Sequence, residues 1–164
     1  MFRKGDLVLH RCYGAGVVVN IRKVSMTENE QAYYTVDLTT GERLLIPVNQ
    51  AEQLGLSAMV HSEAILKVLS DAPQLLADDY RLRKTEIDRK MSSGDPLRIA
   101  EVLRDLTWRE HDAKLSTGDA GLRGDALKFL SGLLAAHSGT DTQSASGCLS
   151  AALKQSILAR RMSV

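Results

Sequence analysis

The sequence predicts an α+β protein in which a small Tudor/SH3-like β-barrel is followed by an all-α helical bundle. Two observations lead to this fold class. Residues 1–48 alternate short β-prone runs with glycine-containing turns, whereas after Pro47 apolar residues recur at the three- and four-residue steps of helices. We therefore expect four regions: a β-domain over 1–56, a connecting segment with a short helix over 57–75, a helical domain over 76–138, and a flexible linker with a C-terminal helix over 139–164.

The β-domain is expected to contain short strands joined by tight turns. The predicted strands are Leu7–His10, Val17–Val24, Ala32–Leu38 and Arg43–Pro47. The segments 13–16 and 39–42 are typical of glycine turns, and Met26–Gln31 is predicted to be a polar loop. Strands this short and closely spaced usually curl into a partly open barrel. An edge strand of such a barrel offers unpaired backbone groups to a strand of a partner protein.

The most sharply specified helix begins at Asp95-Pro96. An aspartate carboxylate at the N-cap accepts a free backbone N–H, and proline fits the first helical position, where no N–H is needed. The helix should continue to about Ala113 with one apolar face in the core and one polar face toward solvent or a partner. The apolar face is formed by Ile99, Ala100, Leu103 and Leu106, and the polar face by Arg98, Glu101, Arg104 and Asp105.

The other helices are predicted from start and stop signals. Ser62 is expected to cap a helix over Glu63–Leu69, and a second helix should run from about Asp78 to Ser92. Ser116 and Asp119 resemble a capping box for a helix that ends near Ser138. The segment 139–147 is rich in Ser, Thr and Gly and is predicted to be a flexible linker before an amphipathic segment, Cys148–Met162.

Composition limits the classes of function. The chain has 21 basic and 20 acidic residues and a net charge of +1. This positive charge is far smaller than that of a protein that binds nucleic acid by itself. Cys12 and Cys148 have no nearby cysteine partner, which favours reduced cytosolic thiols. There is no apolar run of membrane length and no signal-peptide pattern at the N-terminus. We expect a cytoplasmic monomer without membrane contact.

No motif indicates catalysis, a metal or a cofactor. The four histidines lack a second ligand at metal spacing, and the segment 14–16 lacks the third glycine and following helix of a dinucleotide loop. No nucleophile elbow is present. Tyr13, Tyr33 and Tyr34 could contribute to a methyl-lysine cage, but adjacent strand residues face opposite sides, so at most one of Tyr33 and Tyr34 could line it. We therefore expect no enzyme, no metal and no cofactor.

The stretch 79–84 places Tyr80 at a helix start, with Arg81, Arg83 and Lys84 in the next turn. This pattern matches a nucleic-acid wedge, in which cationic side chains neutralise phosphates while the ring enters a groove. From the residues alone, the favoured interpretation is a solvated helix face with Tyr80 packed into the core. Trp108, one step off the apolar stripe, is similarly better explained by packing than by binding.

Four motifs then follow one another along the chain: Lys-Gly-Asp-Leu-Val, Tyr-Gly-Ala-Gly-Val-Val, Leu-Ile-Pro-Val and Ser-Gly-Asp-Pro-Leu-Arg-Ile-Ala-Glu-Val-Leu-Arg-Asp-Leu. In this order they resemble the CarD/CdnL family of bacterial transcription regulators, over roughly residues 2–137. The resemblance implies a Tudor-like domain that pairs a strand with the lobe of the RNA polymerase β subunit. It also implies a helical domain that contacts promoter DNA at the upstream edge of the bubble and stabilises the open complex. The implied location is the bacterial nucleoid, through RNA polymerase.

Carried over residue by residue, the resemblance places Tyr80 where the family typically has a tryptophan wedge. The implied DNA-contacting residues are Tyr80, Arg81, Arg83, Lys84, Arg89 and Lys90. The implied polymerase-contacting residues are Arg22, Lys23, Arg43, Leu44, Leu45 and Ile46. The chain departs from the family pattern where relatives often have basic residues, at Leu45, Leu82, Gly121, Asp125 and Leu127. These missing charges motivate an alternative, a polymerase- or protein-binding adaptor without direct DNA contact.

Overall fold

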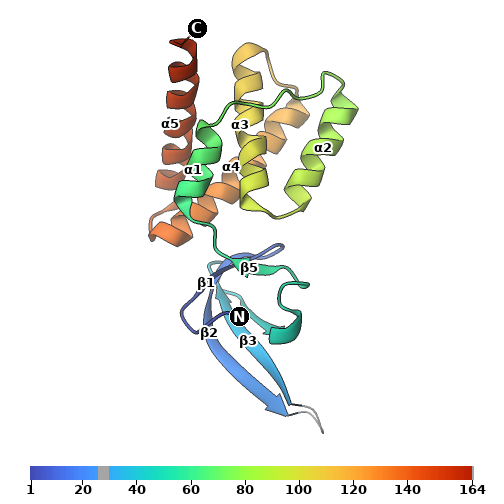
Figure 1. Ribbon diagram of the computed structural model, residues 1–164, viewed down its shortest axis with the longest axis vertical. Coiled ribbons are helices and arrows are strands. Elements are labelled where there is room, and N and C mark those ends of the chain that lie inside the picture. The colour runs from blue at the N-terminus through green and yellow to red at the C-terminus, as the bar shows by residue number, and fades with distance from the viewer. Residues whose placement is uncertain (26–29, 164) are drawn as a thin grey trace. The chain divides into compact units, whose positions relative to one another are not determined.

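The computed structural model describes residues 1–25 and 30–163, and it divides into two compact units, Met1–Met59 and Val60–Val164 (Figure 1). The first unit is a β-sheet and the second is helical, which confirms the predicted α+β class. The loop predicted at Met26–Gln31 lies mostly outside the described residues, and its last two residues belong to a strand. No helix in the described part of the chain is long and apolar enough to cross a membrane.

The first unit contains one antiparallel sheet, whose described strands have the order β4-β3-β2-β1-β5. The strands are β1 (Leu7–His10), β2 (Gly14–Ser25), β3 (Glu30–Leu38), β4 (Arg43–Pro47) and β5 (Leu56–Ala58), and a short 3-10 helix, η1 (Val48–Gln50), follows β4. The predicted barrel is not confirmed, because this sheet is open, with β4 and β5 at its two edges. Strand β5 was not predicted from the sequence; it pairs with β1 and lies partly in the predicted connecting segment.

An apolar core covers one face of the sheet. Its buried members are Val8, Val18, Tyr34, Val36, Leu38, Ile46, Ala51 and Leu56. Gly16 lies where β2 approaches β3 closely, since a Cβ there would be 2.8 Å from the carbonyl oxygen of Asp37. Gly14 and Gly16 belong to β2, where they lie opposite His10 and Val8 of β1. The turn that was predicted at 13–16 therefore lies at Arg11–Tyr13 instead.

The second unit packs its described helices around α3 (Figure 1). The helices are α1 (Ser62–Ser70), α2 (Tyr80–Ser92), α3 (Pro96–Asp112), α4 (Thr117–Ser138) and α5 (Thr142–Arg161). In Figure 1, α3 lies between α1 and α2, and α5 runs along α1. Helix α1, which was predicted to belong to a connecting segment, is part of this unit, because its buried Ile65 and Leu69 face the other helices.

Side-chain caps start two helices, α3 and α4, as predicted. Asp95 accepts a hydrogen bond from the Leu97 N–H at 2.9 Å, and Ser116 accepts one from the Asp119 N–H at 3.1 Å. Helix α1 is different, because its N-cap is His61 rather than Ser62, and no side chain closes the cap.

The predicted flexible linker over 139–147 is wrong. Helix α5 begins at Thr142, where Asp141 accepts a hydrogen bond from the Ser144 N–H at 2.7 Å. The buried residues of this helix are Ala145, Leu149, Leu153, Ser156 and Ile157. Burial of this face outweighs the loop-like Ser, Thr and Gly composition of the segment.

The polar face predicted for α3 is also partly wrong. Arg104 and Asp105 are only 4% and 2% exposed and pair with each other at 2.8 Å. Asp105 accepts a hydrogen bond from the backbone N–H of Gln74 at 3.0 Å, and Arg104 donates one to the carbonyl of Val68 at 3.3 Å. The end of α1 and the segment that joins it to α2 therefore cover this side of α3.

Candidate functional site

Tyr80 is the first residue of α2, directly after the N-cap. Asp79 accepts a hydrogen bond from the backbone N–H of Leu82 at 3.0 Å, which begins the helix at this point. Tyr80 is 42% exposed as a whole residue. The prediction that Tyr80 is packed into the core is therefore wrong, and the residue is partly accessible from outside the protein.

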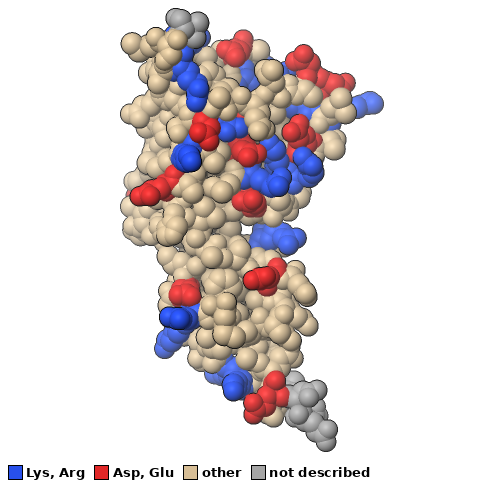
Figure 2. Space-filling view, in the orientation of Figure 1, with Lys and Arg blue, Asp and Glu red and all other residues tan. Residues whose placement is uncertain are grey.

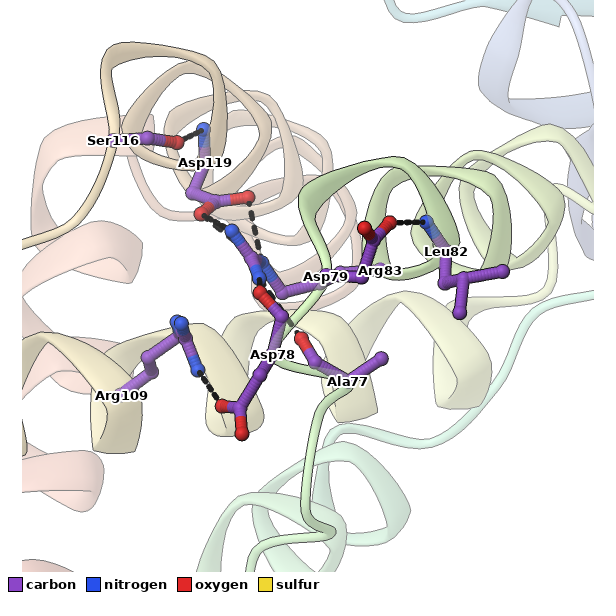
Figure 3. Close-up of polar contacts among 8 residues, drawn as sticks. All are labelled: Ala77, Asp78, Asp79, Leu82, Arg83, Arg109, Ser116 and Asp119. Atoms are coloured by element: carbon purple, nitrogen blue, oxygen red, sulfur yellow. Dashed lines mark hydrogen bonds and ion pairs between the residues drawn. The ribbon is translucent and has the colours of Figure 1, made fainter.

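Arg83, one turn further along α2, is buried against α4 (Figure 3). Its Nη2 lies 2.9 Å from Asp119 Oδ2, and its Nε also donates to the Asp119 carboxylate. Its Nη1 donates to the carbonyls of Ala77 at 2.8 Å and Asp78 at 2.9 Å. With these donors occupied inside the protein, Arg83 does not present its charge to a phosphate, which corrects its predicted role as a DNA contact.

Lys90 is the second predicted DNA contact that the structure removes from the surface. It is 6% exposed, and its Nζ lies 3.0 Å from Glu101 Oε2 on α3. The ion pair and the burial make Lys90 a link between α2 and α3. It therefore does not contribute to a phosphate-binding surface.

The remaining predicted basic residues of α2 are exposed. Lys84 pairs with Asp88 one turn later, and this hydrogen bond raises the pKa of the Lys84 ammonium group. Arg81 and Arg89 form no ion pair with any described residue. Two arginines thus have no carboxylate partner among the described residues, whereas Lys84 is already paired with Asp88.

The charge around α2 is mixed. Leu82 is 67% exposed at a position where a basic residue was expected from the family pattern. Figure 2 shows Lys and Arg interspersed with Asp and Glu over the visible face of the helical unit. A mixed surface makes few phosphate contacts, so the unit should bind DNA weakly by itself.

In the first unit, the outer edge of strand β4 pairs with no described strand. The Leu38 N–H donates a hydrogen bond to the Glu42 carbonyl at 2.8 Å, so this pair is a hydrogen-bonded pair of the β3–β4 ladder. Because hydrogen-bonded pairs alternate in an antiparallel ladder, Leu44 and Ile46 bond to β3, and Arg43 and Leu45 direct their backbone groups to the open edge. The predicted edge position of this strand is therefore confirmed.

The side chains of β4 divide in the same alternating way. Ile46 is 4% exposed in the core of the unit and Leu44 packs against that core, so the buried side chain of Ile46 leaves only its backbone for the predicted contact. Leu45 is 65% exposed. Arg43 is also exposed, and its Nη2 donates to Asp37 Oδ2 at 2.9 Å. This pairing raises the pKa of Arg43 and lowers that of Asp37.

Arg22 and Lys23 lie in β2 and are both exposed. In the sheet register they stand opposite Tyr33 and Ala32 of β3. They therefore provide positive charge on the same unit as the open edge, although β3 separates them from β4. Tyr34 is 1% exposed, so it cannot line an open aromatic cage.

Two residues near the start of α4, one that contacts Tyr80 and one that contacts Arg83, were not predicted as part of this site. Asp119 was identified only as part of a capping box, and its role as the partner of Arg83 depends on a contact across 36 positions. Gly118 lies beside the Tyr80 ring and was not singled out at all. Local patterns carry no signal for either contact, because both join separate helices.

Comparison with known proteins gives matches over both units. Residues 2–60 match a family model described as the CarD-like/TRCF RID domain, and residues 64–150 match one described as the C-terminal domain of CarD. A Bacillus subtilis (strain 168) protein named "Putative transcription factor YdeB" is 24% identical over 136 residues. The aligned region covers 79% of this chain and 88% of that relative.

Proposed function

The chain belongs to the CarD/CdnL family of transcription regulators, which are not enzymes, and we propose that it binds the lobe of the RNA polymerase β subunit and stabilises promoter open complexes. In this proposal the first unit holds the polymerase. The second unit contacts DNA at the upstream edge of the bubble. The open edge of β4, within the region that matches the CarD-like/TRCF RID domain, is the observation that carries the proposal.

Strand pairing fits the polymerase contact because backbone groups supply most of its affinity. Arg43 and Leu45 have outward backbone groups, so a partner strand can add to β4 without displacing β3. Leu45, where a basic residue was expected, offers an apolar side chain to the partner. The exposed charges of Arg22 and Lys23 would then add long-range attraction to acidic groups on the polymerase.

For the DNA contact, we propose that Tyr80 is the wedge and that Arg81, Lys84 and Arg89 contact the neighbouring phosphates. The exposure of Tyr80 at the start of α2 supports this assignment. An aromatic ring can enter a groove at an unstacked base step while nearby cations neutralise phosphates. With few cations available, the contact depends on the polymerase to raise the local concentration of the protein at the promoter.

Two measurements test this proposal. Calorimetric titration of the chain into the isolated β-subunit lobe should show saturable binding, and absence of binding to both the lobe and whole polymerase would overturn it. In the second, the chain should lengthen the lifetime of a promoter open complex. Tyr80→Ala should abolish the lengthening while it leaves lobe binding unchanged, and an unchanged lifetime effect would refute the wedge.

The adaptor without DNA contact is the second candidate, and the burial of Arg83 and Lys90 favours it. Footprinting of the polymerase–promoter complex separates the two candidates. Upstream protection that depends on this protein would exclude the adaptor. An unchanged footprint together with retained lobe binding would support it.

A further inference from the structure

The tip of the Tyr80 side chain rests against the first turn of α4. A Cβ atom added to Gly118 would overlap the Tyr80 hydroxyl and would lie 3.3 Å from the ring carbon Cζ. Gly118 is in the ordinary helical conformation, so the backbone itself does not require glycine here. The space that the missing side chain leaves is occupied by the phenol of Tyr80.

A second contact fixes the same ring. The guanidinium carbon of Arg83 lies 5.6 Å from the centroid of the Tyr80 ring, at the distance of a cation–π contact. Arg83 is in turn bound by Asp119, the residue after Gly118 in α4 (Figure 3). The same turn of α4 therefore affects the ring in two ways. Gly118 contacts the ring directly, and Asp119 binds Arg83, which contacts the ring.

We propose that Gly118, Arg83 and Asp119 are positioning residues that hold the Tyr80 ring in the orientation in which it meets DNA. This inference rests on the proposed function of Tyr80 as a wedge. It differs from the family resemblance in the role of Arg83, which acts on the ring from inside the protein instead of on a phosphate. Gly118 provides the space, and the Arg83–Asp119 pair prevents the ring from turning away.

The glycines of α4 provide matched controls. A Cβ added at Gly121, Gly124 or Gly132 meets nothing within 4 Å. Gly118→Ala and Gly124→Ala therefore make the same chemical change in the same helix, with the same gain in helix propensity. They differ in that only the first places a methyl group where the Tyr80 hydroxyl lies. The hydroxyl is at the far end of a flexible side chain, so Gly118→Ala should fold normally with a displaced ring.

The first measurement uses the free, full-length protein. Ring resonances of Tyr80, assigned by their loss in Tyr80→Phe, should shift in Gly118→Ala and remain at their wild-type positions in Gly124→Ala. Unshifted ring resonances in Gly118→Ala would contradict the packing of the Tyr80 ring against Gly118. This result does not depend on polymerase or DNA.

The second measurement is the lifetime of the promoter open complex. Gly118→Ala should lose the lengthening to the same extent as Tyr80→Ala, and Gly124→Ala should retain it. The positioning role would be overturned if Tyr80→Ala abolishes the lengthening of the open-complex lifetime but Gly118→Ala, with a displaced ring, lengthens it as much as the wild type does. If Tyr80→Ala itself still lengthens the open-complex lifetime fully, both the proposed wedge and the positioning role are refuted. The ring resonances would still show whether the Tyr80 ring packs against Gly118.

Discussion

Arg83 and Asp119 form a buried ion pair between α2 and α4, with Nη2 and Oδ2 2.9 Å apart and the side chains 5% and 1% exposed. Asp119→Ala would leave the guanidinium buried without its counter-charge. We expect the free energy of unfolding to fall by about 3–5 kcal/mol, the usual cost of removing one partner of a buried pair. Urea denaturation followed by circular dichroism measures this loss.

Asp88→Ala is the control for that experiment. It removes the partner of Lys84 in an exposed ion pair on α2, where water screens the charges. The urea midpoint should stay at the wild-type value. Equal losses from the two substitutions would contradict a special role for the buried pair.

The open edge of β4 leads to a prediction about polymerase binding. Leu45→Pro removes a backbone N–H that points away from β3, so the sheet should stay intact while the partner strand loses a donor. Leu45→Ala shortens the same side chain and keeps the donor. Calorimetry with the β-subunit lobe should show much weaker binding for the proline variant than for the alanine variant. Equal affinities would argue against strand pairing at this edge.

Helix α5 should contribute strongly to the stability of the second unit. Leu153 is 4% exposed, so Leu153→Ala should lower the free energy of unfolding by about 2–5 kcal/mol through lost burial and a new cavity. Leu158 in the same helix is 60% exposed, and Leu158→Ala should change stability little. Denaturation curves of the two variants provide the comparison. Similar values would mean that α5 does not dock as described.

The N-terminus of α5 should respond to acid. The Ser144 backbone N–H and hydroxyl donate hydrogen bonds to Asp141, and these bonds lower the pKa of its carboxyl group. Because the folded pKa lies below the unfolded value, the cap stabilises fully above the ordinary aspartate pKa and is lost as the pH falls through the lowered one. The Ser144 amide resonance should follow this transition in an NMR titration.

Asp141→Asn tests that assignment, since asparagine is also a good N-cap but does not titrate. In this variant the Ser144 amide resonance should stay constant over the acid range. A transition that persists in the variant would have to come from another carboxyl group.

Elements with local start signals could be predicted from the sequence. Asp95-Pro96 begins α3 because the carboxylate cap and the proline act within one turn of their own position. The strand predicted at Arg43–Pro47 agrees with the bounds of β4, because glycine turns and β-prone residues delimit it locally. The candidate wedge at Tyr80 was likewise located by sequence position.

Burial of polar residues could not be predicted in the same way. Arg83, Lys90 and Arg104 look like surface cations in a helical pattern, yet each is buried with a carboxylate partner. A periodic pattern reports which residues share a face, but it does not report which neighbouring helix or loop covers that face. The segment 139–147 was mistaken for a linker for the same reason, since its apolar contacts lie in distant parts of the chain.

The sequence by itself therefore determined the strands β1 to β4, the start of α3, the family resemblance and the position of the candidate wedge, because these depend on residues close together in the chain. Only the tertiary structure decided which cations remain free and what holds the Tyr80 ring. Arg83 and Asp119 are 36 positions apart, and the pair forms because the packing of α2 against α4 removes both charges from water and leaves each as the other's partner.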